Sequence, residues 1–215
     1  MKKPRQIYNG NQYEDSIHLD FGAGKVPRNP FQCSKLFTLD IYENSNSENH
    51  YIIEKGARLP FTDDFFDSVS AYDVLEHLSR EMVNGQNEFI FYMNEICRVL
   101  KPKGFAVFVF PSIPNSEVFS DPTHTNFITK NTINYFLGNN DEEGYAGIKT
   151  RYIKVLNSKL RFFEKWVEND NLFSDTITLR RKLSLLKRKI YRITTPSHRI
   201  WVMQKFNKDQ DSVDL

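Results

Sequence analysis

Two glycines and an aspartate, Gly22, Gly24 and Asp40, have the spacing of a nucleoside-binding site. The glycines follow an apolar run, and without side chains they let the backbone turn sharply and approach a ligand closely. In an α/β sheet, ligands bind beyond the carboxyl ends of the strands. Asp40 follows the next apolar run, where an acid can accept hydrogen bonds from both ribose hydroxyls. The pattern therefore predicts a ligand that contains a nucleoside.

The loop after these glycines differs from a dinucleotide-binding loop. The dinucleotide fingerprint requires a third glycine at position 27, and this chain has Pro27 there. Pro27 and Pro30 also shorten any helix that follows, so no helix N-terminus is expected to bind a pyrophosphate. We therefore expect a nucleoside ligand without a diphosphate.

Short apolar runs, separated by longer segments, must position these residues. The runs predict strands at residues 16–21, 36–41, 51–53, 66–72 and 105–110. Apolar residues at helical spacing predict an amphipathic helix that ends near Pro102: Phe89, Met93, Ile96, Cys97 and Leu100. Strands that alternate with helices indicate an α/β fold.

The pattern changes after Pro111. A long loop is expected over residues 112–126, followed by a helix over 129–137 with Thr129 as its N-cap. Three further segments are a strand or hairpin at 152–163, a last strand at 198–206 and a frayed tail at 207–215.

The composition is that of one folded domain. The chain has 215 residues, of which 40% are apolar, enough for a hydrophobic core. No apolar run approaches the length of about 20 residues that a membrane-spanning helix needs. No apolar stretch follows the basic start, so we expect no signal peptide and a cytoplasmic location. Two cysteines are too few for a disulfide framework.

Positive charge is concentrated in one segment. The net charge is only +2, yet residues 180–192 include Arg and Lys side chains and no acid. Apolar residues at steps of three and four predict a basic amphipathic helix over 179–193. Its simplest role is to pack on the domain with its charges in water. Binding of an anionic acceptor, peripheral contact with membrane headgroups and self-association stay open.

Five sequence blocks extend the nucleoside pattern, in the order His18–Gly24, Leu39–Asp40, Leu59–Asp67, Tyr72–His77 and Glu95–Gly104. Together they resemble the blocks of class I S-adenosylmethionine-dependent methyltransferases of the small methyltransferase-11 type. The resemblance covers residues 16–111 and implies S-adenosylmethionine as cofactor. It also implies a Rossmann-like α/β sheet of seven strands, with the last strand antiparallel and helices on both faces.

The resemblance divides the chain and assigns roles by position. Residues 1–215 would form one domain, with a cofactor-binding half at 16–111 and the acceptor lid, last strands and basic insertion at 112–206. The residues implied for the cofactor are Asp20, Gly22, Ala23 and Gly24 at its methionine end, Asp40 at its ribose, Ile41, Arg58 and Leu59 at its adenine, and Tyr72 and Asp73 near its sulfonium. An acidic, aromatic-lined pocket suits that cation.

The chain departs from the family pattern at several places, Lys55 and Lys103 among them. Lys55, beside Glu54, stands where the family often has an acid that binds the adenine amino group, so adenine recognition by a side chain stays open. Lys103 replaces a common glycine in a turn. No metal is expected, because Asp63 and Asp64 fall in a turn and further acids in a metal-binding arrangement are not evident.

Two histidines and an acid are the catalytic candidates. Methyl transfer to oxygen needs alignment and usually a base, for which histidine has a suitable pKa. His77 follows the fourth predicted strand, near the expected donor methyl. His124 and Asp121 lie in a Pro-Thr-His block that would roof the acceptor pocket. In the alternative interpretation, His77 starts a helix and packs on its loop, while Asp121 and His124 only hold their loop by hydrogen bonds.

The predicted function is methyl transfer to a small-molecule, sugar or glycolipid acceptor, at a hydroxyl. This acceptor class rests on family analogy. Two alternatives stay open: an RNA methyltransferase whose basic helix contacts phosphates, and an inactive methyltransferase-like partner or scaffold subunit. A nucleic-acid acceptor is less favoured, because the chain outside the basic segment is acidic. The oligomeric state is not predicted.

Overall fold

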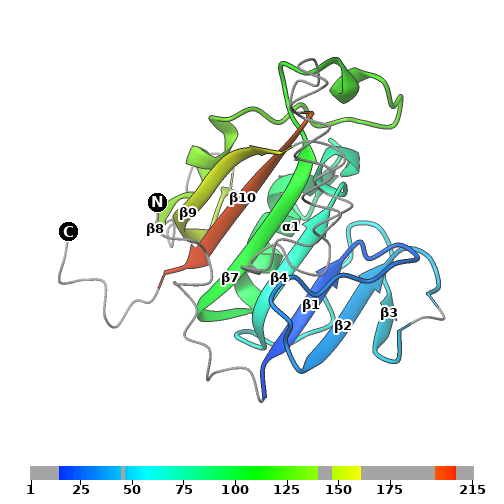
Figure 1. The fold of residues 1–215 in the computed structure, drawn as a ribbon, viewed down its shortest axis with the longest axis vertical. Coiled ribbons are helices and arrows are strands. Elements are labelled where there is room, and N and C mark those ends of the chain that lie inside the picture. The colour runs from blue at the N-terminus through cyan, green and yellow to red at the C-terminus, as the bar shows by residue number, and fades with distance from the viewer. Residues whose placement is uncertain (1–14, 45–46, 140–146, 161–196, 207–215) are drawn as a thin grey trace, which may run out of the picture.

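The computed structural model describes residues 15–44, 47–139, 147–160 and 197–206 (Figure 1). Its centre is an eight-stranded sheet with the order β3-β2-β1-β4-β7-β10-β9-β8. The strands are β1 Ile17–Phe21, β2 Lys35–Asp40, β3 His50–Ile52, β4 Phe66–Tyr72, β7 Leu100–Pro111, β8 Gly138–Asn139, β9 Arg151–Leu160 and β10 His198–Lys205. A separate pair is formed by β5 Met82–Val83 and β6 Gln86–Asn87.

The direction of the strands confirms the predicted methyltransferase-type sheet. β3, β2, β1, β4 and β7 are parallel neighbours, whereas β10 runs antiparallel to both β7 and β9. All five strands predicted before Pro111 are present, and so are the two expected near the C-terminus. β8 is a two-residue edge strand that pairs with β9 and that the sequence did not predict.

One α-helix, α1 Glu88–Val99, occurs in the part of the chain that the structure describes, and it matches the predicted amphipathic helix. It begins at the N-cap Asn87, whose side-chain oxygen accepts a hydrogen bond from the Phe89 backbone N–H at 2.9 Å. Met93 and Ile96 are fully buried in the larger core cluster, together with side chains from one face of the sheet. α1 thus covers that face (Figure 1).

The opposite face holds a smaller core cluster. Side chains from β7 and β10 pack there against Phe31 and Cys33 of the connection between β1 and β2. We expected helices on both faces, but this connection is not helical. Pro27 and Pro30 lack backbone donors, which explains why the segment forms an irregular cover instead.

The lid segment is less helical than the sequence predicted. It contains the 3-10 helices η3 Ser116–Phe119 and η4 Thr132–Phe136. The helix predicted over 129–137 is therefore present only as the shorter η4, and its N-cap is Asn131 rather than Thr129. Thr129 instead closes a local turn, in which its backbone N–H donates to the Thr132 hydroxyl at 3.0 Å. The chain then enters β8 at Gly138, which limits the helix to little more than one turn.

A buried polar chain crosses the sheet beneath the site. His18 Nδ1 lies 2.7 Å from Ser68 Oγ, and His18 Nε2 lies 2.8 Å from Ser70 Oγ. The Ser70 hydroxyl donates to Asp20 Oδ1 at 2.9 Å, so His18 Nε2 must supply the proton of its own bond to Ser70. Burial lowers the pKa of His18 to about 3, consistent with a neutral ring that has a structural role.

The predicted basic helix over 179–193 and the tail at 207–215 lie outside the described residues, as does the end of the strand predicted at 152–163. Among the residues that are described, no helix has the length and apolar character to span a membrane.

The turn at the start of β7 generates a stability prediction. Lys103 has a left-handed backbone conformation, with φ of 65°, which costs a residue with a Cβ about 1 kcal/mol relative to glycine. Its carbonyl accepts a hydrogen bond from Gln204 Nε2, and a glycine would keep that bond. We expect Lys103→Gly to raise the free energy of unfolding by about 1 kcal/mol, measured by urea denaturation.

Lys103→Ala is the matched control, because it removes the charge and keeps the Cβ. We expect it to give no comparable gain in stability. Equal stabilisation by both variants would show that the charge of Lys103, rather than its backbone conformation, sets the effect.

Candidate active site

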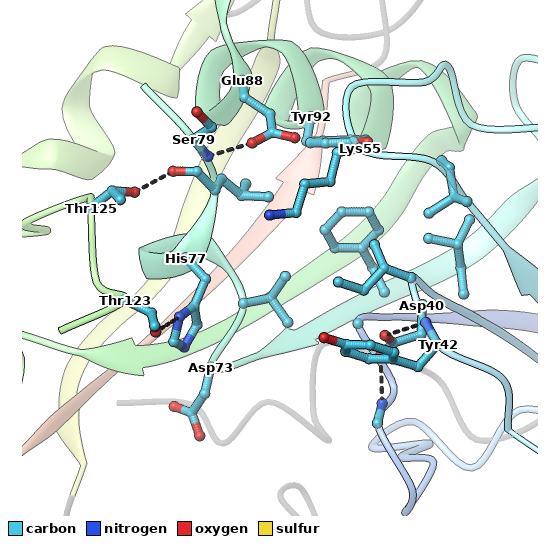
Figure 2. Close-up of a pocket in the computed structure, with 18 residues that line it drawn as sticks. Asp40, Tyr42, Lys55, Asp73, His77, Ser79, Glu88, Tyr92, Thr123 and Thr125 are labelled. Carbon is cyan, nitrogen blue, oxygen red and sulfur yellow. Dashed lines mark hydrogen bonds between the residues drawn. The ribbon is translucent and has the colours of Figure 1, made fainter. Parts of the chain in front are cut away.

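A cavity of about 660 Å³ opens at the carboxyl ends of β1, β2 and β4 (Figure 2). Its volume is within the range of cofactor and small-molecule sites. Its wall is formed by Phe21, Gly22, Gly24, Leu39, Asp40, Ile41, Tyr42, Ile53, Lys55, Asp73, Val74, His77, Leu78, Ser79, Glu88, Tyr92, Thr123 and Thr125.

The glycine turn after β1 forms one end of the cavity. Gly22 and Gly24 have φ of 71° and 57°, in the left-handed region that favours glycine. A Cβ on Gly22 would lie 2.2 Å from Val74 Cγ2, which is closer than two carbon atoms can approach. Gly22 is therefore required both for the turn and for close contact with the segment after β4.

Asp40 holds the glycine turn from the adjacent strand. Its Oδ2 accepts a hydrogen bond from the Gly24 backbone N–H at 2.8 Å, and its Oδ1 accepts one from the Tyr42 N–H at 3.1 Å. Each carboxylate oxygen has a further lone pair that a hydroxyl can use. Ile41 and Tyr42 are exposed beside it, so this end offers an acid next to apolar surface.

The other end of the cavity contains His77, in the 3-10 helix η2 Leu75–His77 that follows β4. His77 Nδ1 lies 2.9 Å from Thr123 Oγ1, whose hydroxyl donates to Asp121 Oδ1 at 2.6 Å. His77 Nδ1 must therefore donate its proton to Thr123, which leaves a lone pair on Nε2. Burial, together with the nearby ring of His124, lowers the pKa of His77 and favours the neutral ring.

His124 lies directly behind His77. The two ring centroids are 4.7 Å apart in an edge-to-face arrangement. His124 Nδ1 is 2.8 Å from the Val118 carbonyl oxygen, which can only accept, so this nitrogen also carries the proton. Asp121 Oδ2 is 3.9 Å from His124 Nε2. The structure thus brings the three catalytic candidates together, although only His77 lines the cavity.

The lid carrying His124 is fixed to η2 by several hydrogen bonds. The backbone N–H groups of Thr125 and Asn126 donate to the Glu76 carbonyl at 2.7 and 3.0 Å. The Asn126 side-chain amide donates to the carbonyls of Leu75 and Leu78 at 3.0 and 2.6 Å. These bonds set the position of His124 relative to His77.

Comparison with known proteins identifies the domain. The family model described as a methyltransferase domain matches residues 19–108. This match contains the glycine turn, Asp40 and η2, which line the cavity, but not Thr123 and Thr125 of the lid. Residues 19–108 therefore carry a methyltransferase domain, in agreement with the resemblance to class I S-adenosylmethionine-dependent enzymes. The domain match and the structural neighbours support S-adenosylmethionine as the cofactor.

Solved structures share the fold at low sequence identity. A methyltransferase from Archaeoglobus fulgidus is 15% identical, with a TM-score of 0.54, and the match covers 94% of this chain and 90% of that one. Phosphoethanolamine N-methyltransferase 1 from Haemonchus contortus is 12% identical, with a TM-score of 0.57, over 93% of this chain but only 41% of that one.

The [4+2]-cyclase SpnF is also similar, at 13% identity and a TM-score of 0.50, over 91% of this chain and 76% of that one. A cyclase among these matches illustrates that similarity at this level gives the fold and leaves the acceptor open. Comparison with curated proteins gave no match.

Of the residues predicted for the cofactor, five line the cavity of the methyltransferase: Gly22, Gly24, Asp40, Ile41 and Asp73. Asp73 has φ of 54°, and its carboxylate lies 3.3 Å from His198 Nε2. The adjacent Tyr72 points to the opposite face of the sheet, where the Arg28 guanidinium lies 4.7 Å from its ring centre. Tyr72, the last residue of β4, therefore packs in the smaller core cluster, whereas Asp73, which follows the strand, lines the cavity.

Four other predicted cofactor residues do not line the cavity: Asp20, Ala23, Arg58 and Leu59. Asp20 is fully buried, and its second oxygen accepts the Arg28 backbone N–H at 2.7 Å. Arg58 is mostly exposed and lies 3.7 Å from Glu95. Ala23 and Leu59 are buried, and the Leu59 backbone N–H donates to Glu95 at 2.9 Å.

The wall opposite Asp40 includes residues that the sequence did not indicate. Glu88 and Tyr92 are one turn apart on α1 and face the cavity (Figure 2). Glu88 accepts a hydrogen bond from the Ser79 backbone N–H, and the Tyr92 hydroxyl accepts one from Gly56 N–H at 3.0 Å. Lys55 extends into the cavity between them and His77. Helical periodicity predicted α1 but not which of its polar residues reach a ligand.

The buried Asp20 generates a pH-dependent prediction. Burial raises its pKa to about 7 from an ordinary value of 3.8. Between those two values the folded state keeps a proton that the unfolded state has lost, so Asp20 lowers the free energy of unfolding as pH rises through this window. Asp20→Asn cannot ionise. We therefore expect its stability relative to wild type to rise by on the order of 4 kcal/mol from pH 4 to pH 7.

Urea denaturation of both proteins at several pH values measures this difference. His18 has an opposite effect on stability in the same window, because its folded pKa is lowered, but both proteins contain it and it cancels. Asp15→Asn, at an exposed position, is the control. Parallel stability curves for wild type and Asp20→Asn would contradict the assignment.

Proposed function

We propose that this methyltransferase methylates a hydroxyl group of a small-molecule, sugar or glycolipid acceptor. The proposal rests on His77, which lies at the end of the cavity opposite the glycine turn. Its imidazole is neutral and has a lone pair on Nε2. A hydroxyl must lose its proton during methylation, and an imidazole of this kind can accept it.

The residues of the cavity fit the cofactor. We assign Gly22 and Gly24 to its methionine end, Asp40 to its ribose hydroxyls and Ile41 to its adenine. The open lone pairs of Asp40 and the closely approaching glycine backbone support this assignment. Asp73 and Glu88 add negative charge to the wall, and a nearby negative charge stabilises a sulfonium cation.

S-adenosylmethionine supplies a methyl carbon whose bond to sulfur breaks as a carbon–oxygen bond forms to the acceptor, which yields S-adenosylhomocysteine, a methyl ether and one proton. We assign that proton to His77 Nε2. Thr123 keeps the ring in this tautomer because its hydroxyl oxygen accepts a hydrogen bond from the His77 Nδ1–H. Asp121 in turn accepts a hydrogen bond from the Thr123 hydroxyl and fixes its orientation. His124 acts as a positioning residue that packs against the His77 ring.

The charges of the cavity favour a small acceptor over RNA. Its wall contains three acids, Asp40, Asp73 and Glu88, and one lysine, Lys55. This balance repels a polyanion, since phosphate contacts require clustered Lys or Arg. The basic segment at 180–192 lies outside the described residues and lends no support to either acceptor class.

Asp40 provides the direct test of the cofactor assignment. We expect Asp40→Ala to weaken binding of S-adenosylhomocysteine by ten-fold or more, because it removes the ribose acceptor and releases the Gly24 turn. A ten-fold change corresponds to about 1.4 kcal/mol. Isothermal titration calorimetry of the purified protein measures the affinity.

Asp15→Ala is the matched control, because Asp15 is an exposed acid that does not line the cavity. We expect its affinity for S-adenosylhomocysteine to equal that of wild type. Equal affinities for all three proteins would remove Asp40 from the cofactor site. The absence of any binding to folded wild type would remove the cofactor assignment itself.

The acceptor class is tested by measuring S-adenosylhomocysteine release with a panel of hydroxylated small molecules, sugars, lipid-linked sugars and RNA. With the acceptor that gives turnover, we expect His77→Ala to lower kcat by about 10²-fold or more, the usual contribution of a general base. Its affinity for S-adenosylhomocysteine should change by less than about three-fold. Full turnover by both His77→Ala and His124→Ala, or turnover with RNA alone, would refute the proposal.

A further inference from the structure

The carboxyl group of Glu76 has an unusual environment. Glu76 is only 1% exposed, and among the described residues neither of its carboxylate oxygens accepts a hydrogen bond from another residue. Leaving a buried polar group without a partner costs about 1–3 kcal/mol, and more if the group is charged. Proteins retain such groups at functional sites or where an ion completes their contacts.

Two imidazole rings that could bind a metal ion, those of His77 and His124, lie beside this carboxyl group. Glu76, His77 and His124 each offer one ligand atom, and these atoms lie within 4.8 Å of one another. The Nδ1 atoms of both rings are committed as donors, to Thr123 and to the Val118 carbonyl. Metal-binding histidines usually donate their other ring N–H to a carbonyl or polar side chain in this way, which fixes the ring and leaves a lone pair for the metal.

We propose that Glu76, His77 and His124 bind a divalent transition-metal ion of the Zn²⁺ type at the acceptor end of the cavity. Two imidazole nitrogens and one carboxylate oxygen are a donor set of catalytic zinc sites, in which a fourth position stays open for water or substrate. Imidazole ligands favour Zn²⁺ and similar ions over Mg²⁺ and Ca²⁺, which prefer oxygen ligands.

The geometry requires small side-chain movements to close around an ion. A tetrahedral site with bonds of about 2.1 Å places its ligand atoms about 3.4 Å apart, closer than the present separation of up to 4.8 Å. The backbones of η2 and the lid are already joined, because Thr125 and Asn126 donate to the Glu76 carbonyl. Side-chain rotation can therefore close the site without moving the fold.

Burial raises the pKa of Glu76 to about 8, so without an ion this carboxyl group is mainly protonated near neutral pH. A bound cation would favour the ionised form and satisfy the buried oxygens. Asp121, whose Oδ2 is 3.9 Å from His124 Nε2, supplies a further carboxylate at the rim. Once an ion is bound, carboxylates would therefore lie on both sides of the imidazoles.

The role of the ion rests on the proposed function, although its binding does not. An acceptor hydroxyl in the open position would have its pKa lowered by the cation, as metal-bound water does. With the ion bound, the Nε2 lone pair of His77 would be used for the metal, so the ion would replace His77 as the group that activates the hydroxyl, and the proton of the hydroxyl would leave to solvent. The methylated oxygen would belong to a group small enough to reach the ion inside the cavity.

Metal binding is tested on full-length protein treated with chelator and then dialysed. Calorimetric titration with ZnCl₂ should show one equivalent bound, and titration with CoCl₂ should produce the visible absorption bands of four- or five-coordinate cobalt. We expect Glu76→Gln and His124→Ala each to weaken Zn²⁺ binding by ten-fold or more. His50→Gln, outside the cluster on β3, is the matched histidine control and should bind as wild type does.

The absence of a saturable Zn²⁺ equivalent in wild type would overturn the proposal, as would equal binding by wild type and both cluster variants. Glu76 is buried, so circular dichroism should verify the fold of its variant, and His124→Ala gives the answer if Glu76→Gln unfolds. Titration of the metal-free protein with S-adenosylhomocysteine separates the two proposals. Cofactor binding without Zn²⁺ binding would overturn the metal site alone.

Discussion

The contact between Gly22 and Val74 is the constraint on which the cavity depends. No side chain fits between them, because a Cβ at position 22 would lie 2.2 Å from Val74 Cγ2. The turn after β1 therefore lies directly against the segment after β4, and η2 begins at the next residue, Leu75. This one close contact therefore fixes the two ends of the cavity relative to each other: the glycine turn at one end and η2, with His77, at the other.

Hydrogen bonds extend this placement in both directions. On one side, Asp40 accepts from the Gly24 N–H and couples β2 to the glycine turn. On the other, Thr125 and Asn126 donate to carbonyls of η2 and position the lid. Because short 3-10 helices leave their carbonyls without internal partners, η2 supplies acceptors that a longer helix would have used itself. The irregular structure after β4 is thus what allows the lid to dock.

The sequence predicted the features that depend on local patterns. Apolar runs located the main strands and α1, and the glycine spacing located the turn, because these signals reflect backbone requirements. It did not predict that Tyr72 faces away from the cavity or that Glu88 faces into it, because tertiary packing sets side-chain direction. The short η4 also departed from prediction, since β8 ends the segment at Gly138. The sequence indicated His77 and His124 as separate catalytic candidates but did not predict that their rings are in contact.

Two carboxyl groups, those of Asp20 and Glu76, are buried in this fold, and they differ in their hydrogen bonds. Asp20 has both oxygens engaged, by the Ser70 hydroxyl and the Arg28 backbone N–H, so its burial is compensated by the chain itself. Glu76 is equally buried within the described structure but receives no such bond. Burial raises the pKa of both groups, to about 7 and about 8, yet only Glu76 adjoins two imidazoles with available lone pairs. This difference in hydrogen bonding is why the metal proposal concerns Glu76 and not Asp20.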